Sequence, residues 1–345
     1  MKALVLTAIV LVLFHAGWYG ITVDKTRAFS ANEAMVDAFQ SRMQKRLNIV
    51  VDKSVIQAAT LEANGIRLHL DILDAGPGAP VLVFIPGTAV YAGVYIELLY
   101  ALYREGLTVV GFDPRGHGRS SGTRGDYTIN QIVDDALAVA AYARQRFGGK
   151  VAVAGSSQGG IAAFYAAARD SSLAGAVCHN IADLNGRDNL RLSRFKIPPA
   201  MVPVNQALLR FYGSFAIPIF LYLDLSREFL KDGTPASDYV REDPLCVTWV
   251  TLRALGSLMK TDLARPVEAI TVPVMLIHSE RDTLFPQGYV EDIYKRLTCP
   301  KAYLLLKDRD HMVMTNHVDE VAPSVADWLK IMTQASTPGG EEKSD

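Results

Sequence analysis

Strand-like and helix-like segments alternate along most of this 345-residue chain. The strand-like segments are short, continuous apolar runs, which are typical of strands that are covered on both faces. Val81–Ile85 is such a run, and a helical stretch separates it from the next run at Leu107–Phe112. The same order continues with a helical stretch at Ile129–Phe147 and a strand-like run at Leu173–Cys178, and it returns between Val274 and Met332. This alternation predicts an α/β fold with a mostly parallel sheet and helices on both faces.

A hairpin is expected in front of these segments. Two alternating runs, Val55–Glu62 and Ile66–Leu73, flank the dipeptide Asn64-Gly65. This dipeptide between extended runs is a strong signal for a tight turn joining antiparallel strands. The predicted sheet is therefore mixed, with an antiparallel hairpin at its start.

The alternation is lost between Asn180 and Pro266, where prolines break the pattern and FYGSFAIPIFLYLDL forms a long apolar run. This segment ends in a helical stretch at Trp249–Met259. We interpret residues 180–266 as a helical cap inserted into one domain of residues 51–335. The polar residues 336–345, with paired glycines, are expected to be a disordered tail.

The N-terminus has a different character, because Ala3–Val23 carries no formal charge. A helix of about 20 apolar residues is long enough to cross a bilayer, and Trp18 and Tyr19 near its end suit the interface. Residues 1–23 are therefore expected to be a membrane anchor. The alternative is a cleaved signal sequence with secretion, although Phe14-His15-Ala16 is a poor cleavage site. Residues 24–50 are expected to contain an amphipathic linker helix, since Met35, Phe39, Met43 and Leu47 follow helical spacing.

Charge and cysteine content exclude several other classes of protein. The formal net charge of −1 does not favour a nucleic-acid partner. The three cysteines lie far apart in sequence and form no CxxC pair, which argues against a metal cluster or a disulfide scaffold.

The pentapeptide Gly155-Ser156-Ser157-Gln158-Gly159 follows the apolar run VAVA and precedes a helical stretch. A GxSxG motif between a strand and a helix is typical of a nucleophile elbow, a sharp turn that projects the central serine. Ser157 is therefore the candidate nucleophile. The N–H of Gln158 would lie at a helix N-terminus, where it can stabilise an oxyanion.

A serine hydroxyl needs a base, and the base needs a carboxylate that orients it. His311 follows the last predicted strand, and Asp282 follows the strand before it. The order Ser157, Asp282, His311 is the order expected for such an elbow. His317 remains the alternative base, and Glu280, Asp308 and Asp310 remain alternative acids.

A second oxyanion donor is expected in the loop after Val81–Ile85. Gly87 permits close approach of the backbone there, and the N–H of Thr88 is the candidate donor. A plain proline–glycine turn at Pro86-Gly87 is the alternative interpretation.

With these motifs in place, the chain resembles the α/β-hydrolase superfamily, and in particular its monoglyceride lipase and lysophospholipase branch. The segment DPRGHGRSSG, Asp113 to Gly122, is similar to a D-x-R-G-H-G-x-S-x-G loop of that branch. The resemblance covers residues 55–332 and implies that His117 is structural. The chain departs from the branch at Pro86-Gly87, where His-Gly is frequent, and the cap carries no motif that identifies a substrate.

The expected activity is hydrolysis of a carboxylic ester through an acyl-enzyme. A lipid ester such as a monoacylglycerol or a lysophospholipid is favoured by the apolar cap and the N-terminal segment. No metal or organic cofactor is implied. Peptidases, thioesterases and acyltransferases use the same triad and remain alternatives. A non-catalytic, membrane-tethered binding protein is the alternative from another class.

Overall fold

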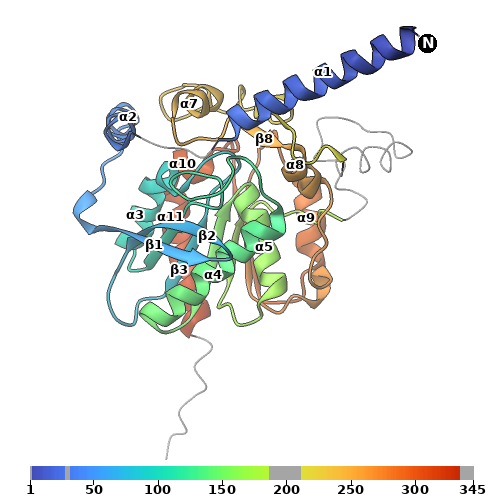
Figure 1. Cartoon of the computed structure of the whole chain (residues 1–345). Helices are drawn as coiled ribbons and strands as arrows, with labels where there is room; N and C mark the ends of the chain where they lie inside the picture. The colour runs from blue at the N-terminus through green and yellow to red at the C-terminus, as the bar shows by residue number, and fades with distance from the viewer. Residues whose placement is uncertain (1, 28–31, 186–210, 335–345) are drawn as a thin grey trace, which may run out of the picture.

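An eight-stranded sheet forms the centre of the protein (Figure 1) in a computed structural model that describes residues 2–27, 32–185 and 211–334. The strand order is β1-β2-β4-β3-β5-β6-β9-β10. The β1–β2 and β2–β4 pairs are antiparallel and all other pairs are parallel. The strands are β1 (Ile56–Ala63), β2 (Ile66–Leu73), β3 (Val81–Ile85), β4 (Thr108–Phe112), β5 (Val151–Ser156), β6 (Ala176–His179), β9 (Val274–Ser279) and β10 (Lys301–Leu306). The predicted α/β-hydrolase fold class is confirmed.

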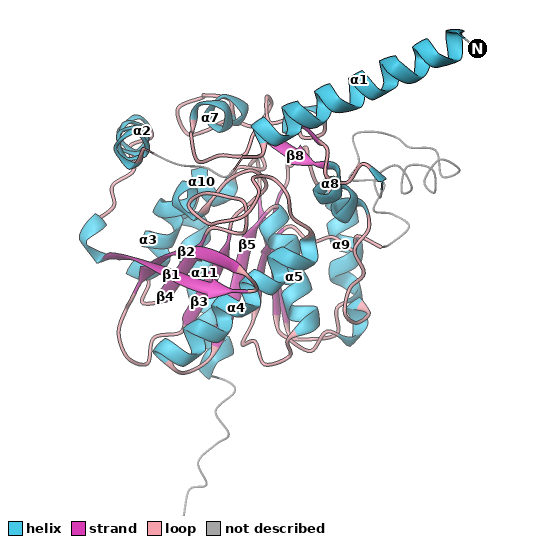
Figure 2. Ribbon diagram, viewed as in Figure 1, coloured by secondary structure: helices cyan, strands magenta, loops and turns pink. Residues whose placement is uncertain are grey.

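Helices cover both faces of this sheet (Figure 2). The pair α3 and α11 pack against each other on one face, and the pair α4 and α5 do so on the other. The helices on the two faces are α3 (Ile96–Arg104), α4 (Ile129–Phe147), α5 (Gln158–Arg169), α9 (Gln287–Arg296) and α11 (Val318–Gln334). The short helix α10 (Val313–Asn316) packs against α3 and α11. Every residue of β3, β4, β5 and β6 is buried between the two layers, which explains their continuous apolar sequences. Short 3₁₀ turns complete the connections: η1 (Lys53–Val55), η2 (Ala92–Tyr95), η5 (Ile219–Leu221) and η6 (Val267–Ala269).

The hairpin expected at Asn64-Gly65 joins β1 to β2 with Ala63 opposite Ile66. Asn64 has φ 54° and Gly65 has φ 72°. A two-residue turn with positive φ at both positions matches the right-handed twist of the strands that it connects.

Residues between β6 and β9 form a separate layer at one end of the sheet (Figure 1). Its described elements are β7 (Ala216–Pro218), α7 (Ala236–Glu242), β8 (Trp249–Thr251) and α8 (Leu252–Met259). We expected a helix over all of Trp249–Met259. Its first three residues instead form β8, because they pair antiparallel with β7. Part of the proposed cap (residues 186–210) and the proposed tail (residues 336–345) lie outside the described residues.

The N-terminal helix α1 (Lys2–Lys25) ends against this cap. The indole N–H of Trp18 donates to the carbonyl of Ala216 at 2.9 Å, and the N–H of Ala216 donates to Thr22 Oγ1 at 3.0 Å. The ring of Phe215 lies edge-on to that of Trp18, with centroids 4.9 Å apart. The apolar residues near the end of α1 therefore pack against the cap.

The expectation of a membrane anchor at residues 1–23 is wrong. Over the described ranges, no helix is both long enough and apolar enough to span a bilayer. The interpretation of Ala3–Val23 depended on its lack of charge, its length and the aromatic residues Trp18 and Tyr19 near its end. It did not include the contacts that Trp18 and Thr22 make with the cap.

The second helix, α2 (Glu33–Arg46), also rests on the cap. Its buried side chains are Val36, Phe39 and Met43, whereas Met35 is 53% exposed. Phe39 packs against Tyr239 of α7 with ring centroids 5.7 Å apart. The apolar stripe of this helix therefore faces the rest of the folded domain.

The three cysteines are all buried and free. Cys178 lies in β6, Cys246 lies between α7 and β8, and Cys299 lies between α9 and β10.

Candidate active site

Ser157 occupies the sharp turn between β5 and α5. Its backbone has φ 54° and ψ −117°, a combination that a residue with a side chain seldom adopts. The turn depends on two glycines. A Cβ on Gly155 would lie 2.0 Å from the carbonyl oxygen of Gly159, and a Cβ on Gly159 would lie 2.1 Å from that of Ile85. Strand and helix therefore approach each other as a nucleophile elbow requires.

Asp282 and His311 meet beyond the carboxyl ends of the two neighbouring strands β9 and β10. The Nδ1–H of His311 donates to Asp282 Oδ2 at 2.8 Å. The Asp282 side chain is fully buried, and its Oδ1 accepts the N–H groups of Leu284 and Phe285, each at 2.8 Å. The ring of Phe285 stacks at 4° to that of His311, with centroids 5.9 Å apart. The carboxylate and the stacked ring together fix the orientation of the imidazole.

The electrostatics of the pair suit an imidazole that gains a proton. Burial alone would raise the pKa of Asp282, but His311 and the hydrogen bonds to the carboxylate outweigh it and hold this pKa well below its usual range. Burial alone would lower the pKa of His311, but Asp282 outweighs it and leaves this pKa above the ordinary 6.5. The aspartate therefore remains ionised while the histidine titrates.

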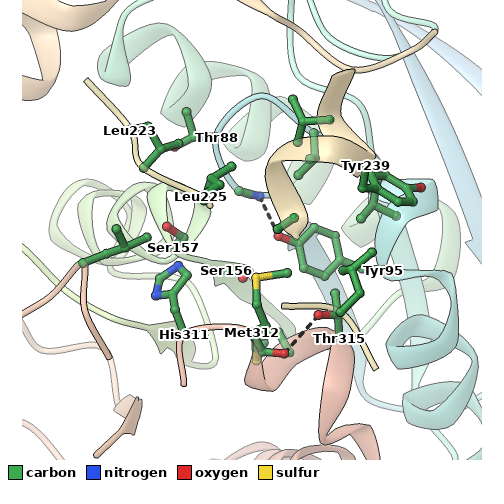
Figure 3. A pocket seen from close by; sticks show the side chains of 18 residues that line it. Thr88, Tyr95, Ser156, Ser157, Leu223, Leu225, Tyr239, His311, Met312 and Thr315 are labelled. Carbon is green, nitrogen blue, oxygen red and sulfur yellow. Dashed lines mark hydrogen bonds between the residues drawn. The ribbon is translucent and has the colours of Figure 1, made fainter. Parts of the chain in front are cut away.

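Ser157 and His311 line one pocket between the sheet and the cap. Figure 3 shows their two side chains next to each other. No hydrogen bond joins them in the described structure, and such bonds are often long in a free enzyme. The remaining wall is mostly apolar and comes from both layers. Representative side chains are Val90, Val94 and Met312 from the sheet side and Leu225, Leu230 and Tyr239 from the cap.

Both candidate oxyanion donors lie beside Ser157. Thr88 lines the pocket, and its hydroxyl donates to Gln158 Oε1 at 3.2 Å. Gly87 donates its own N–H to the Tyr95 hydroxyl at 3.3 Å, which fixes the loop that carries Thr88. Within the described residues, neither the N–H of Thr88 nor that of Gln158 forms a hydrogen bond. Both N–H groups therefore remain candidates for stabilising an anion at Ser157.

A network of buried polar side chains also contacts Asp282. The sequence did not predict this network. Asn180, at the end of β6, donates its amide N–H to Asp282 Oδ2 at 2.9 Å. Its Oδ1 lies 2.6 Å from His278 Nδ1, and neighbouring His179 lies 3.1 Å from Ser156 Oγ. Asn180 has φ 70°, a conformation that asparagine tolerates better than most residues. Its position directly after an apolar run was the only available signal.

The alternative acids and base lie elsewhere. His317 pairs with Glu320 at 3.4 Å and does not line the pocket. Asp308 pairs with exposed Arg281, and Glu280 accepts the backbone N–H of Asp308. Asp310 accepts the backbone N–H of Met312 at 2.9 Å. The structure therefore brings Asp282, and none of these carboxylates, into contact with the imidazole of His311.

The loop from Asp113 to Gly122 is built around buried side chains. The Asp113 carboxylate accepts the N–H groups of Ala92 at 3.0 Å and Arg119 at 2.8 Å. His117 is 1% exposed, and its Nδ1–H donates to the carbonyl of Arg115 at 2.9 Å. Burial lowers the pKa of His117 to about 4, and nearby Arg124 adds to this effect. These contacts fit a structural role for His117.

One trio in the described part of the chain has the donor set of a metal site. Atoms of His179, Asp282 and His311 lie within 4.8 Å of one another. The Nδ1 of His311 already donates to Asp282, so a cation there would compete with the hydrogen bond that orients the imidazole.

Comparison with known proteins places these features in a family. Residues 77–317 match the family model described as serine aminopeptidase, S33. The chain is 25% identical over 239 residues to a bifunctional esterase/perhydrolase of Acinetobacter calcoaceticus, covering 62% of this chain and 78% of the relative. It is 22% identical over 283 residues to the serine hydrolase BPHL of Mus musculus, covering 80% and 88%.

Solved structures with the same fold include two lipases. The monoacylglycerol lipase of Paleococcus ferrophilus aligns with a TM-score of 0.61 and 23% identity, over 77% of this chain and 99% of the lipase. A soluble variant of the monoglyceride lipase from Saccharomyces cerevisiae aligns with a TM-score of 0.64 and 16% identity, over 81% and 97%. The matched family model covers the elbow and both loops at the carboxyl ends of β9 and β10. The chain therefore belongs to the serine aminopeptidase S33 family of the α/β-hydrolase superfamily, and it is a serine hydrolase of the esterase and lipase type.

Proposed function

We propose that the protein hydrolyses carboxylic esters with an apolar acyl chain, such as monoacylglycerols or lysophospholipids, through Ser157, His311 and Asp282. The observation that carries this proposal is the oriented His311–Asp282 pair beside the elbow serine, at one end of an apolar pocket. The fold alone supports many chemistries, so the argument for this one depends on the site.

In the first half of the reaction, Ser157 Oγ attacks the acyl carbonyl carbon and its proton passes to His311 Nε2. The N–H groups of Thr88 and Gln158 stabilise the negative charge that develops on the carbonyl oxygen. The imidazolium then gives its proton to the oxygen of the leaving alcohol as the ester bond breaks. An acyl-enzyme on Ser157 and a free alcohol result.

In the second half, water attacks the acyl carbon while His311 takes its proton. The tetrahedral intermediate collapses, His311 returns a proton to Ser157 Oγ, and the carboxylic acid leaves. Asp282 stays ionised throughout and stabilises the imidazolium, in agreement with its low pKa.

The pocket wall favours an acyl chain over a peptide N-terminus. An aminopeptidase needs an anion or strong acceptors for the α-ammonium group of its substrate. Among the described residues that line the pocket, none is an aspartate or a glutamate. The walls given by Leu223, Leu225 and Leu230 of the cap suit a hydrocarbon instead. We propose that the cap, residues 180–266, is an insertion that supplies this acyl-binding wall.

The comparisons support the same direction. Two proteins that share the fold are described as a monoacylglycerol lipase and a monoglyceride lipase, and a more similar relative in sequence is described as an esterase/perhydrolase. A small amphiphilic ester is therefore the proposed partner of the pocket.

Labelling with a fluorophosphonate separates an enzyme from a non-catalytic binding protein. The parent should be labelled and Ser157→Ala should not, because the substitution removes only the nucleophilic oxygen. Ser171→Ala, an exposed serine just after α5, is the matched control and should keep the label. Equal labelling of the parent and Ser157→Ala would contradict the assignment of the nucleophile.

The substrate class is tested with p-nitrophenyl esters of increasing acyl length, a monoacylglycerol, a lysophospholipid, an acyl thioester and an aminoacyl anilide. We expect kcat/KM to rise from short to medium acyl chains, because each buried methylene contributes about 0.8 kcal/mol. A preference for the aminoacyl anilide would refute the lipid proposal in favour of a peptidase.

A further inference from the structure

The cap carries one charged side chain that is buried against the catalytic loops. Glu228 lies between Leu225 and Leu230 and is 0% exposed. Its Oε1 accepts the hydroxyl of Thr283 at 2.5 Å, and its Oε2 accepts the backbone N–H of His311 at 3.1 Å. Thr283 directly follows the proposed acid, and His311 is the proposed base. One carboxylate of the cap thus contacts both loops.

We propose that Glu228 is a positioning residue through which the cap holds the acid and base loops in register and stabilises the protonated His311. The proposal rests on the proposed function of Ser157, His311 and Asp282. Glu228 acts through His311, since it does not line the pocket.

The first argument is the cost of burying this charge. Removing a carboxylate from water costs several kcal/mol unless the site compensates it. Burial raises the pKa of Glu228, whereas the hydrogen bond from Thr283 and the charge on His311 act in the opposite direction. Each carboxylate oxygen accepts a hydrogen bond, and these bonds favour the ionised form. Within the described part of the chain, neither lysine nor arginine forms an ion pair with it. The imidazole of His311, which gains a proton during each half-reaction, is the group whose positive charge acts on Glu228.

The second argument is the balance of charge around that imidazole. Asp282, Glu228 and Asp310 raise the pKa of His311, against the effect of its burial. His179 and His278 also lie near the pair, and burial lowers the pKa of both. His311 therefore has two buried carboxylates beside it. Asp282 contacts its ring, and Glu228 contacts its backbone N–H.

The third argument is the way in which the cap holds Glu228. The backbone carbonyl of Glu228 accepts the N–H of Ala236, the first residue of α7, at 2.8 Å. This hydrogen bond joins the segment that carries Glu228 to the start of α7. Leu225, Leu230 and Ala236 all line the pocket. The segment that contacts an acyl chain is thus the same segment that holds the two catalytic loops, and a displaced cap would release both.

The test uses Glu228→Gln and Glu228→Leu in the full chain, with Glu242→Gln and Glu242→Leu as controls. Glu242 is an exposed glutamate of the same cap, at the end of α7. The rate of fluorophosphonate labelling is measured from pH 5 to 9, and kcat and KM are measured with a p-nitrophenyl ester.

Glu228→Gln keeps the shape and one acceptor but removes the charge. Its labelling rate should therefore keep a similar plateau, while the acidic limb moves to lower pH by about half a unit or more. Glu228→Leu removes both acceptors and should lower kcat about tenfold or more, with KM changed less than about twofold, because the pocket wall is kept. The Glu242 variants should match the parent in both measurements.

If the acidic limb of the labelling profile of Glu228→Gln coincides with that of the parent, the proposal is overturned. This result is sufficient even if Glu228→Leu does not fold. A Glu228→Leu protein that folds and keeps the parental kcat overturns the positioning role as well. Ser157→Ala is measured in parallel. If it is still labelled, the proposed function itself has failed. If it is inactive while the Glu228 profiles are unchanged, only the role of Glu228 is wrong.

Discussion

Replacing the buried histidine of the Asp113–Gly122 loop should change how stability depends on pH. His117 is neutral in the folded protein down to a pKa of about 4, whereas an unfolded chain takes up a proton near 6.5. Above pH 6.5 neither state is protonated and the full stability is present. As pH falls from 6.5 to 4, the unfolded state gains the proton first and stability is lost. Below the folded pKa the loss is complete.

The size of this effect follows from the two pKa values. A pKa difference of one unit corresponds to about 1.4 kcal/mol, so His117 accounts for a loss of about 3 kcal/mol in all. Between pH 7.5 and pH 5 the loss is about 2 kcal/mol. Burial raises the pKa of Asp113 in the same loop to about 6, which acts in the opposite sense, because stability from this carboxyl is lost as pH rises. The pH dependence of the parent's stability therefore combines the opposite contributions of His117 and Asp113.

The assay is urea unfolding of the parent and of His117→Asn at pH 7.5 and pH 5. Asparagine keeps a donor for the carbonyl of Arg115 but does not titrate. The variant should be less stable at pH 7.5, since it loses the ring packed 5.0 Å from Tyr127, but should lose about 2 kcal/mol less on acidification. The comparison cancels the contribution of Asp113 and other common groups. An identical loss in both proteins would refute a neutral His117.

Two further predictions concern the triad and the N-terminal helix. Asp282→Asn should lower kcat by roughly 10⁴-fold. Because Asp282 raises the pKa of His311, the acidic limb of the pH profile of kcat/KM should also move to lower pH. An acidic limb that does not move would exclude Asp282 as the partner of His311. Trp18→Ala should lower the free energy of unfolding by about 1–2 kcal/mol, since it removes a hydrogen bond to Ala216 and an edge-on contact with Phe215. Leu13→Ala, at a position that is 65% exposed, is its control, and equal effects would contradict the docking of α1 on the cap.

The parts of the fold that sequence could predict are those with local causes. Val81–Ile85 and Ile129–Phe147 have the predicted bounds, because a fully buried strand and an amphipathic helix leave their periods in the sequence. The helix also begins at a capping box, in which Thr128 and Gln131 bond each other's backbone N–H groups. The elbow also left a local signal in its GxSxG sequence, although only Gly155 is required by a contact inside the turn and Gly159 is required by its contact with Ile85 of β3.

The features that were missed depend on contacts between distant segments. Trp249 begins a strand only because β7 lies beside it, and Trp18 packs against a cap nearly 200 residues away. A glutamate such as Glu228 is ordinarily expected at the surface, and only the arrangement of two loops around it buries its charge. Asp282 and His311 were accessible to sequence reasoning because the carboxyl ends of neighbouring parallel strands bring their loops together.

The distribution of the buried cysteines gives the chain its own reporters of opening. A thiol reagent can reach Cys246 only when the cap moves or unfolds, whereas Cys178 in the central sheet requires a deeper opening. Cys299 samples the neighbourhood of the edge strand β10. The three modification rates therefore measure, in one protein and without any introduced label, how far the stability of the cap differs from that of the sheet beneath it.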